Sequence, residues 1–212
     1  MTTKGRILDA AERLFAQDGI EATSLRAITA EAGANLAAVN YHFQSKEALV
    51  NAVIVRRLAP ITERRLELLE ACERAAGDGA PPLDQVIDAF FRPVVEIFDG
   101  HAKEFGPLMG RLYIEPAEFL ERLYKDHLEQ IAERFLGAYQ RALPDLPRVE
   151  LLWRLHFAMG ALAHTMGGIR MLGLISKGEC DLSDVEGTLQ RLKSFVIAGL
   201  TAPVAEVHYV AH

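Results

Sequence analysis

The fold is decided by residues 23–33, TSLRAITAEAG, and residues 35–43, NLAAVNYHF. Ser24 and Asn35 favour helix starts, because their side-chain oxygens accept a hydrogen bond from a main-chain N–H of the first turn. Gly33, which lies between the two stretches, is typical of a helix end. The pattern predicts two short helices joined by a tight turn, which is the arrangement of a helix-turn-helix.

Apolar residues continue at helical spacing on both sides of this segment. Ile7, Leu14 and Phe15 share one face of an earlier helix that Asp18-Gly19 ends. A long helix begins after Ser45, and Pro60 is expected to kink or end it. No segment alternates as a half-buried strand does. The sequence therefore predicts an all-α protein of about nine helices: an N-terminal three-helix head, followed by a larger helical body.

The last two expected helices are unusually apolar. The first runs from about Val149 to Leu172, and Gly167-Gly168 is expected to break or bend it. The second runs from Ser183 to Ala202. Two such helices can meet those of a second copy in a four-helix seam, which makes a homodimer the expected state. The candidate seam residues of the last helix are Leu189, Leu192, Phe195, Val196, Gly199 and Leu200.

The charge of the chain is unevenly distributed. The 212 residues carry a net charge of −6, but residues 1–65 carry +2 and the remainder −8. This asymmetry favours a small DNA-binding domain over residues 1–55 on an acidic effector-binding and dimerisation domain over residues 56–212. The longest uncharged stretch of the most apolar region, residues 155–169, is shorter than the roughly 20 residues of a membrane helix. With no apolar signal region and no cysteine pair, a cytoplasmic protein is expected, with no membrane partner.

Several side chains of the second and third helices suit double-stranded DNA. Asn40 can make a bidentate contact with adenine, and the small Ala37 lets the helix approach a groove wall. Tyr41, His42 and Lys46 suit phosphate oxygens, although a tyrosine such as Tyr41 can also serve only in packing. For Thr29 the sequence allows either a DNA contact or a solvated position on the helix.

Residues 23–33, residues 39–43 and the tetrapeptide Lys46-Glu47-Ala48-Leu49 closely resemble the DNA-binding head of the TetR family of repressors. The family usually has Gly or Thr where Ala37 stands, and a phosphate-contacting Tyr where Asn40 stands. Residues 35–43 look instead like a branch of the family that includes fatty-acid-responsive regulators, and residues 151–160, LLWRLHFAMG, resemble the effector domain of that branch. The resemblance implies a homodimeric repressor on a palindromic operator, with these DNA-binding residues: Arg26, Thr29, Asn35, Ala37, Asn40, Tyr41, His42 and Lys46.

The body of the chain is rich in large apolar side chains, which line ligand cavities between helices as well as ordinary cores. The expected effector is a fatty acid, an acyl-CoA or another apolar small molecule. Its candidate binding residues are Phe90, Phe91, Met109, Arg111, Tyr113, Trp153, His156 and Phe157. His156 and His164 lie two helical turns apart, about 12 Å, which is too far for one metal ion. No cofactor and no metal are expected.

Three other functions compete with a repressor. The main alternative is a lipid-binding or carrier protein built on a helical bundle. An enzyme would need a nucleophile–base pair, a di-metal motif or a phosphate loop, and the sequence contains none of these. The protein is therefore expected not to be an enzyme. A non-specific nucleic-acid coat protein is disfavoured by the weak positive charge of the head.

Overall fold

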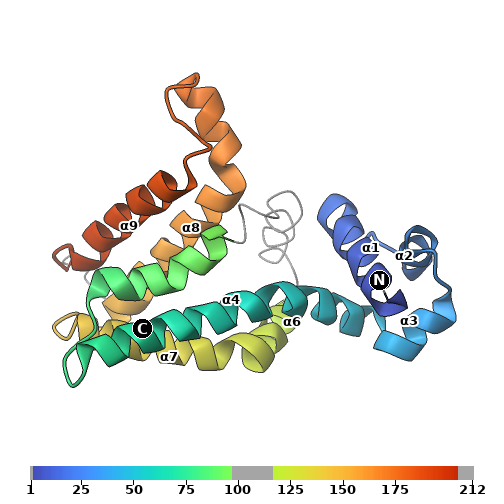
Figure 1. Cartoon of the computed structure of the whole chain (residues 1–212), viewed down its shortest axis with the longest axis horizontal. Coiled ribbons are helices and arrows are strands. Elements are labelled where there is room, and N and C mark those ends of the chain that lie inside the picture. Colours follow the sequence, from blue (N-terminus) through green and yellow to red (C-terminus); the bar gives the residue numbers. More distant parts are fainter. Residues whose placement is uncertain (1, 97–116, 205–212) are drawn as a thin grey trace, which may run out of the picture. The chain divides into compact units, whose positions relative to one another are not determined.

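The computed structural model describes residues 2–96 and 117–204, except for the side chains of residues 167–170. Over these residues it contains helices and no strand (Figure 1). The all-α prediction is confirmed for this part of the chain. The chain divides into two compact units: unit 1 comprises residues 1–65 and 96–132, and unit 2 comprises residues 66–95 and 133–212. The predicted domain boundary at residues 55 and 56 falls inside a continuous helix, α4.

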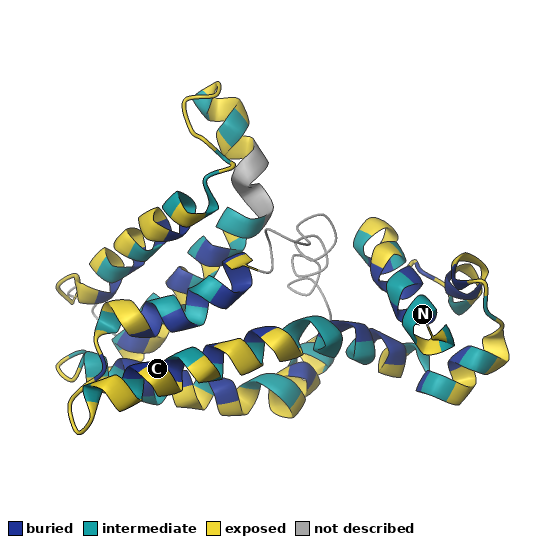
Figure 2. Ribbon diagram, in the orientation of Figure 1, coloured by how far each residue is buried: buried dark blue, intermediate teal, exposed yellow. Residues whose placement is uncertain are grey.

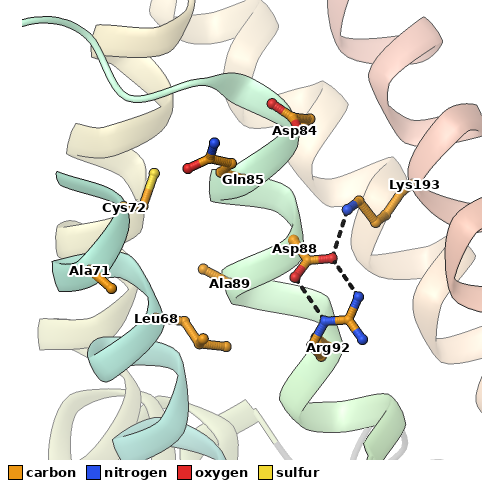
Figure 3. A pocket seen from close by; sticks show the side chains of 9 residues that line it. All are labelled: Leu68, Ala71, Cys72, Asp84, Gln85, Asp88, Ala89, Arg92 and Lys193. Atoms are coloured by element: carbon orange, nitrogen blue, oxygen red, sulfur yellow. Dashed lines mark hydrogen bonds and ion pairs between the residues drawn. The ribbon is translucent and has the colours of Figure 1, made fainter. Parts of the chain in front are cut away.

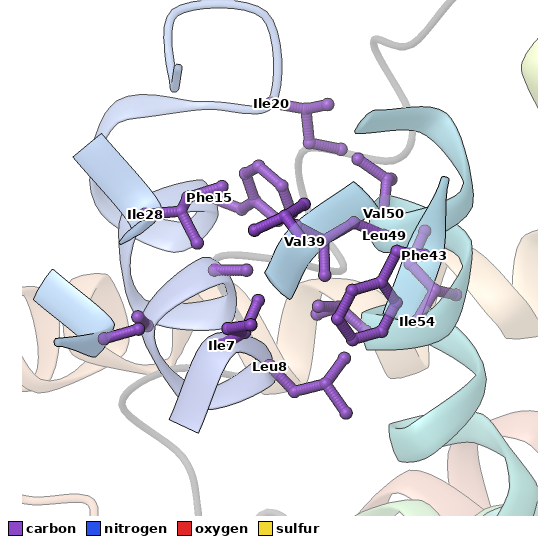
Figure 4. Close-up of a cluster of buried hydrophobic side chains, with 14 of the residues drawn as sticks. Ile7, Leu8, Phe15, Ile20, Ile28, Val39, Phe43, Leu49, Val50 and Ile54 are labelled. Atoms are coloured by element: carbon purple, nitrogen blue, oxygen red, sulfur yellow. The ribbon is translucent and has the colours of Figure 1, made fainter. Parts of the chain in front are cut away.

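Unit 1 begins with three helices, α1 (Thr3–Asp18), α2 (Leu25–Ala32) and α3 (Leu36–Phe43), and contains residues 46–65 of α4 (Lys46–Ala76). It also holds α6 (Ala117–Leu123), the π-helical turn η1 (Tyr124–Leu128) and the first turn of α7 (Glu129–Ala142). Figure 4 shows the core of this unit, in which α1, α2, α3 and α4 contribute Ile7, Phe15, Ile28, Val39, Phe43, Leu49 and Ile54.

The predicted helix starts are confirmed by their hydrogen bonds. The main-chain N–H of Ala27 donates to Ser24 Oγ at 3.1 Å, and that of Ala38 donates to Asn35 Oδ1 at 2.8 Å. Ser45 caps α4 in the same way. Gly33 ends α2 with φ of +56°, a left-handed conformation that costs a glycine little. These local contacts fix the turn between α2 and α3.

Two breaks that the sequence suggests are absent from the structure. The end expected at Pro60 is wrong, because α4 continues to Ala76. Ile61 and Leu69, which follow this proline, are buried, and their burial offsets the one main-chain hydrogen bond that Pro60 cannot donate. Of the break or bend expected at Gly167-Gly168, the break is absent, because α8 runs as one helix from Arg148 to Ser176.

Unit 2 is a bundle of residues 66–76 of α4, a helix over residues 83–96, the remainder of α7, α8 and α9 (Val185–Thr201). Arg154 of α8 joins two of these helices. Its side chain is largely buried, and its guanidinium donates hydrogen bonds to the carbonyl oxygens of Gly199, Leu200, Ala202 and Pro203 at the end of α9. A cation is favourable at a helix C-terminus, so Arg154 satisfies the last carbonyls of α9 and complements the helix dipole.

Candidate nucleic-acid interface

Helix α3 has one face in the core of unit 1 and one face in solvent. Val39 and Phe43 are buried, and Figure 4 shows both side chains directed toward α1 and α4. On the opposite side Ala37 and Asn40 are exposed, Leu36 is 43 % exposed and Tyr41 is 84 % exposed. The helix is therefore held firmly by its inner face and presents its outer face to a partner.

Four of the residues predicted to bind DNA lie exposed on α2 and α3: Arg26, Ala37, Asn40 and Tyr41. The side chain of His42 is partly buried, and its ring stands edge-on to the ring of Tyr41 with the centroids 5.0 Å apart. His42 therefore packs against the tyrosine ring.

Three other predicted residues are occupied within unit 1. Thr29 is buried, and its hydroxyl donates to the carbonyl oxygen of Arg26 at 3.0 Å, so it is not the solvated helix position that the sequence allowed. The amide oxygen of Asn35 is used in capping α3. Lys46 Nζ donates to the carbonyl oxygen of Glu21 at 3.0 Å. That bond ties the start of α4 to the connection between α1 and α2, and it leaves the ammonium group with two further donors.

Helix α3 contains no lysine, arginine, aspartate or glutamate, and such residues lie on the other helices of unit 1. The ammonium of Lys4 is 5.9 Å from the centroid of the Phe43 ring, and Arg13 pairs with Glu31 at 2.8 Å. At the start of α4, hydrogen bonds from its own main-chain N–H and from Ser45 lower the pKa of Glu47. The carboxylate therefore stays ionised beside the helix N-terminus, where the helix dipole favours it.

Unit 2 contains an open cavity of about 450 Å³ (Figure 3). Asp88 is its central charged group: it accepts from Lys193 Nζ at 2.6 Å and from Arg92 Nε at 2.8 Å. Partial burial raises the pKa of Asp88, but the hydrogen bonds from Arg92 and Lys193 outweigh burial and hold it below its ordinary value. The cavity is lined by Leu68, Ala71, Cys72, Asp84, Gln85, Asp88, Ala89, Arg92 and Lys193.

None of the predicted effector-binding residues that the structure describes lines this cavity. Phe91 is buried in unit 2, and Phe90 packs edge-on against Phe135 with the ring centroids 4.9 Å apart. Both phenylalanines are therefore part of the packed bundle. The other candidates from the same segment, Met109, Arg111 and Tyr113, lie outside the described residues.

The aromatic residues of α8 face outward. Trp153 is 54 % exposed and Phe157 is 63 % exposed, with their rings stacked at a centroid distance of 5.9 Å, and His156 beside them is also exposed. On α9 Phe195 is 69 % exposed. Figure 2 shows exposed and buried positions alternating along α9.

The expected seam on α9 needs one correction. Leu189, Leu192, Val196 and Leu200 are buried within the protomer itself, so they belong to the core of unit 2. Phe195 and Gly199 remain exposed. The inner face of α9 packs in the bundle, while its outer face carries Phe195 and Gly199 beside polar residues such as Gln190 and Ser194.

Within residues 2–96 and 117–204, no helix is both long enough and apolar enough to cross a bilayer. The same residues contain no group of three or more His, Cys, Asp or Glu side chains placed to hold a metal ion.

Comparison with known proteins identifies two matching family models. Residues 7–53 match the model described as bacterial regulatory proteins, tetR family, and residues 88–199 match the tetracyclin repressor-like C-terminal domain. The second match alone spans more than half of the chain.

One curated relative and two solved structures extend these matches. The nicotine-responsive transcriptional repressor HdnoR of Paenarthrobacter nicotinovorans is 32 % identical over 138 residues, which are 64 % of this chain and 69 % of that protein. A TetR transcriptional regulator from Legionella pneumophila aligns with a TM-score of 0.59 at 20 % identity, over 93 % of this chain and 96 % of the other. The fatty acid degradation regulator FadR from Bacillus halodurans aligns with a TM-score of 0.55 at 14 % identity, over 91 % and 95 % of the two chains. The two structures share the fold of this chain.

Proposed function

Because the chain belongs to the TetR family of transcriptional regulators, we propose that it is a homodimeric, ligand-responsive repressor that binds a palindromic DNA operator. The observation that carries this proposal is the exposed face of α3, which is held from behind by a buried core and two helix caps. In a helix-turn-helix protein the second helix of the motif enters the major groove, while the first crosses the backbone. Here α3 is the second helix and α2 the first.

The outward aromatic residues of α8 and α9 support the dimer. Trp153, Phe157 and Phe195 are each more than half exposed, whereas aromatic residues are enriched in the cores of protein interfaces. A two-fold axis through this surface would present two copies of α3 to two half-sites, and a palindromic operator would match that symmetry. We therefore assign these aromatic residues to the contact with the partner protomer rather than to effector binding.

The effector in this proposal is a small molecule with a substantial apolar part. The resemblance of residues 35–43 and 151–160 to a fatty-acid-responsive branch favours a fatty acid or acyl-CoA. The relative HdnoR is named for its response to nicotine, a different class of compound. The effector would act by binding one conformation of the repressor more tightly than the other, and its effect on DNA binding is limited by that difference in affinity.

The DNA-binding proposal is tested by selecting duplexes from a random-sequence library with the full chain. We expect an inverted repeat whose half-sites lie about 10 base pairs, or a multiple of this, from centre to centre. If the selection enriches no sequence, the repressor proposal is contradicted, and a helical lipid carrier remains as the alternative.

The identity of the effector is tested by adding fatty acids of increasing chain length to the protein and the selected duplex, with nicotine added in a parallel experiment. Each buried CH₂ contributes about 0.8 kcal/mol, so longer acyl chains should raise the melting temperature progressively and release the DNA. A response to nicotine with none to any acyl compound would exclude the fatty-acid effector and retain the repressor.

A further inference from the structure

Apart from the half-buried His42, α3 carries no basic residue. The helix reads LAAVNYHF from Leu36 to Phe43 and contains neither lysine nor arginine. Arginine or lysine bound to the O6 and N7 atoms of guanine is the commonest specific contact in the major groove. A recognition helix without either residue cannot make that contact from its own side chains.

The first turn of α3 instead presents an apolar surface. Leu36 is the first residue of the helix and is 43 % exposed, and Ala37 beside it is also exposed. The polar side chain just before them is already used, because Asn35 Oδ1 accepts the hydrogen bond from the main-chain N–H of Ala38. The N-terminal residues of a recognition helix are those that meet the base edges. The part of α3 nearest the bases is therefore aliphatic.

One base offers a matching apolar group in the major groove. Thymine carries a methyl group at C5, and apolar side chains such as alanine recognise it by contact. One helical turn after Leu36, the exposed Asn40 carries an amide that can donate to N7 and accept from N6 of adenine. Residues four apart are separated by about 6 Å along the helix axis, which is about two base-pair steps.

The basic residues around α3 are placed for other roles. Lys46 donates to the carbonyl oxygen of Glu21, and the ammonium of Lys4 lies over the ring of Phe43. Arg26 is exposed on α2, the helix that crosses the DNA backbone in this motif. These residues suit phosphate contacts, which carry no sequence information of their own.

We propose that Leu36 and Ala37 read thymine methyl groups, and that the base pairs contacted by α3 in each half-site are A·T pairs. This inference rests on the proposed function and specifies the DNA sequence class that the protein recognises. The contact is formed by the aliphatic start of α3 and supplemented by Asn40 one turn later.

The test uses the duplex recovered from the random library, in which each thymine of one half-site is replaced in turn by deoxyuridine. This replacement removes the C5 methyl group and keeps every hydrogen-bonding atom. Loss of one buried methyl contact is expected to weaken binding about fourfold. Leu36→Ala, which shortens the aliphatic side chain, should reduce the discrimination between the thymine and deoxyuridine duplexes at the critical position, whereas Leu36→Met should retain it. Because Leu36 is partly exposed, both variants should keep the helical content and melting temperature of the parent chain.

The outcomes separate this inference from the proposed function. An enriched half-site whose α3 contacts are G·C pairs, or a duplex in which no thymine-to-deoxyuridine change alters affinity, would overturn the thymine reading while the repressor stands. Discrimination that is unchanged in Leu36→Ala would overturn the role of Leu36. Failure to enrich any sequence would instead overturn the proposed function.

Discussion

Glu12 of α1 and Arg56 of α4 form an ion pair in which Arg56 Nη2 lies 2.5 Å from Glu12 Oε2 and the glutamate side chain is only 3 % exposed. Arg57 Nε reaches the other carboxylate oxygen of Glu12, also at 2.5 Å, and Arg56 bonds to Asp9 as well. Two consecutive arginines of α4 thus form ion pairs with one buried carboxylate of α1. Because α4 begins in unit 1 and ends in unit 2, this cluster anchors the DNA-binding head to a helix that both units share.

Glu12→Gln should lower the free energy of unfolding by about 1–3 kcal/mol. Removing a buried partner leaves the remaining charges uncompensated, and the loss is moderated because both arginines are partly exposed. Glu31→Gln is the matched control, since Glu31 pairs with Arg13 in a more exposed setting and should cost less than about 1 kcal/mol. Chemical denaturation measures both variants, and equal losses would show that the burial of Glu12 has no energetic consequence.

The ion pairs of Asp88 predict an acid-sensitive unit 2. Partial burial raises the pKa of Asp88, but hydrogen bonds from Arg92 and Lys193 lower it below the ordinary 3.8. Arg92 and Gln190 hold the pKa of Glu186 at about 2, against an ordinary 4.5. A carboxyl group with a lowered folded-state pKa stabilises the fold above its unfolded-state pKa, and this contribution is lost as the pH falls through the folded-state value.

The stability gained from this network should therefore be complete above pH 4.5 and decline toward pH 2. Asp88→Asn should destabilise the protein at neutral pH, and its difference from the parent chain should shrink once the pH falls below 3.8. Asp84→Asn, at an exposed position on the same helix, serves as the control. Urea denaturation across this pH range measures the effect. A constant difference between Asp88→Asn and the parent chain would rule out the contribution of the ion pairs.

Lys46 is expected to contact phosphate with the two donors that its bond to Glu21 leaves free. Lys46→Ala should weaken binding to the selected duplex and to a scrambled duplex by the same factor, and it should reduce the salt dependence of binding by about 1 per subunit. Arg191→Ala, which removes an exposed charge from α9, should leave the salt dependence unchanged. If Lys46→Ala has the same slope as the parent chain, the lysine serves only to hold the connection between α1 and α2.

The dimer surface predicts a change of association state. Phe157→Arg or Phe195→Arg places a charge in an apolar interface and should weaken self-association at least about tenfold. Tyr124→Arg alters an aromatic residue of η1 that is also exposed and should leave association intact. Sedimentation equilibrium distinguishes these outcomes. Unchanged association of both phenylalanine variants would move the dimer contact away from this surface.

The sequence predicted the features that depend on neighbouring residues. Ser24 and Asn35 cap their helices as expected because a cap needs only the next three residues. Whether α4 ends at Pro60 depends on tertiary packing. The helix continues because Ile61 and Leu69 are buried, and local helix propensity does not predict that burial.

The candidate site was only partly predictable for a related reason. The exposed face of α3 follows from helical spacing once Val39 and Phe43 are recognised as core. The bond from Lys46 to Glu21 spans 25 residues and has no signal in the sequence. An apolar residue such as Phe157 looks the same in the sequence whether it faces its own core, a ligand or a second protomer, so its exposure came from the structure alone.

The chain is proposed to bind a specific DNA sequence as a dimer, and the most direct test is its relative affinity for the selected palindrome and for a scrambled duplex of identical composition. Both affinities should be measured by fluorescence anisotropy at physiological salt, with the stoichiometry of each complex determined alongside. We predict that the palindrome binds at least about 10³-fold more tightly and takes up two chains. A ratio near one would contradict the account.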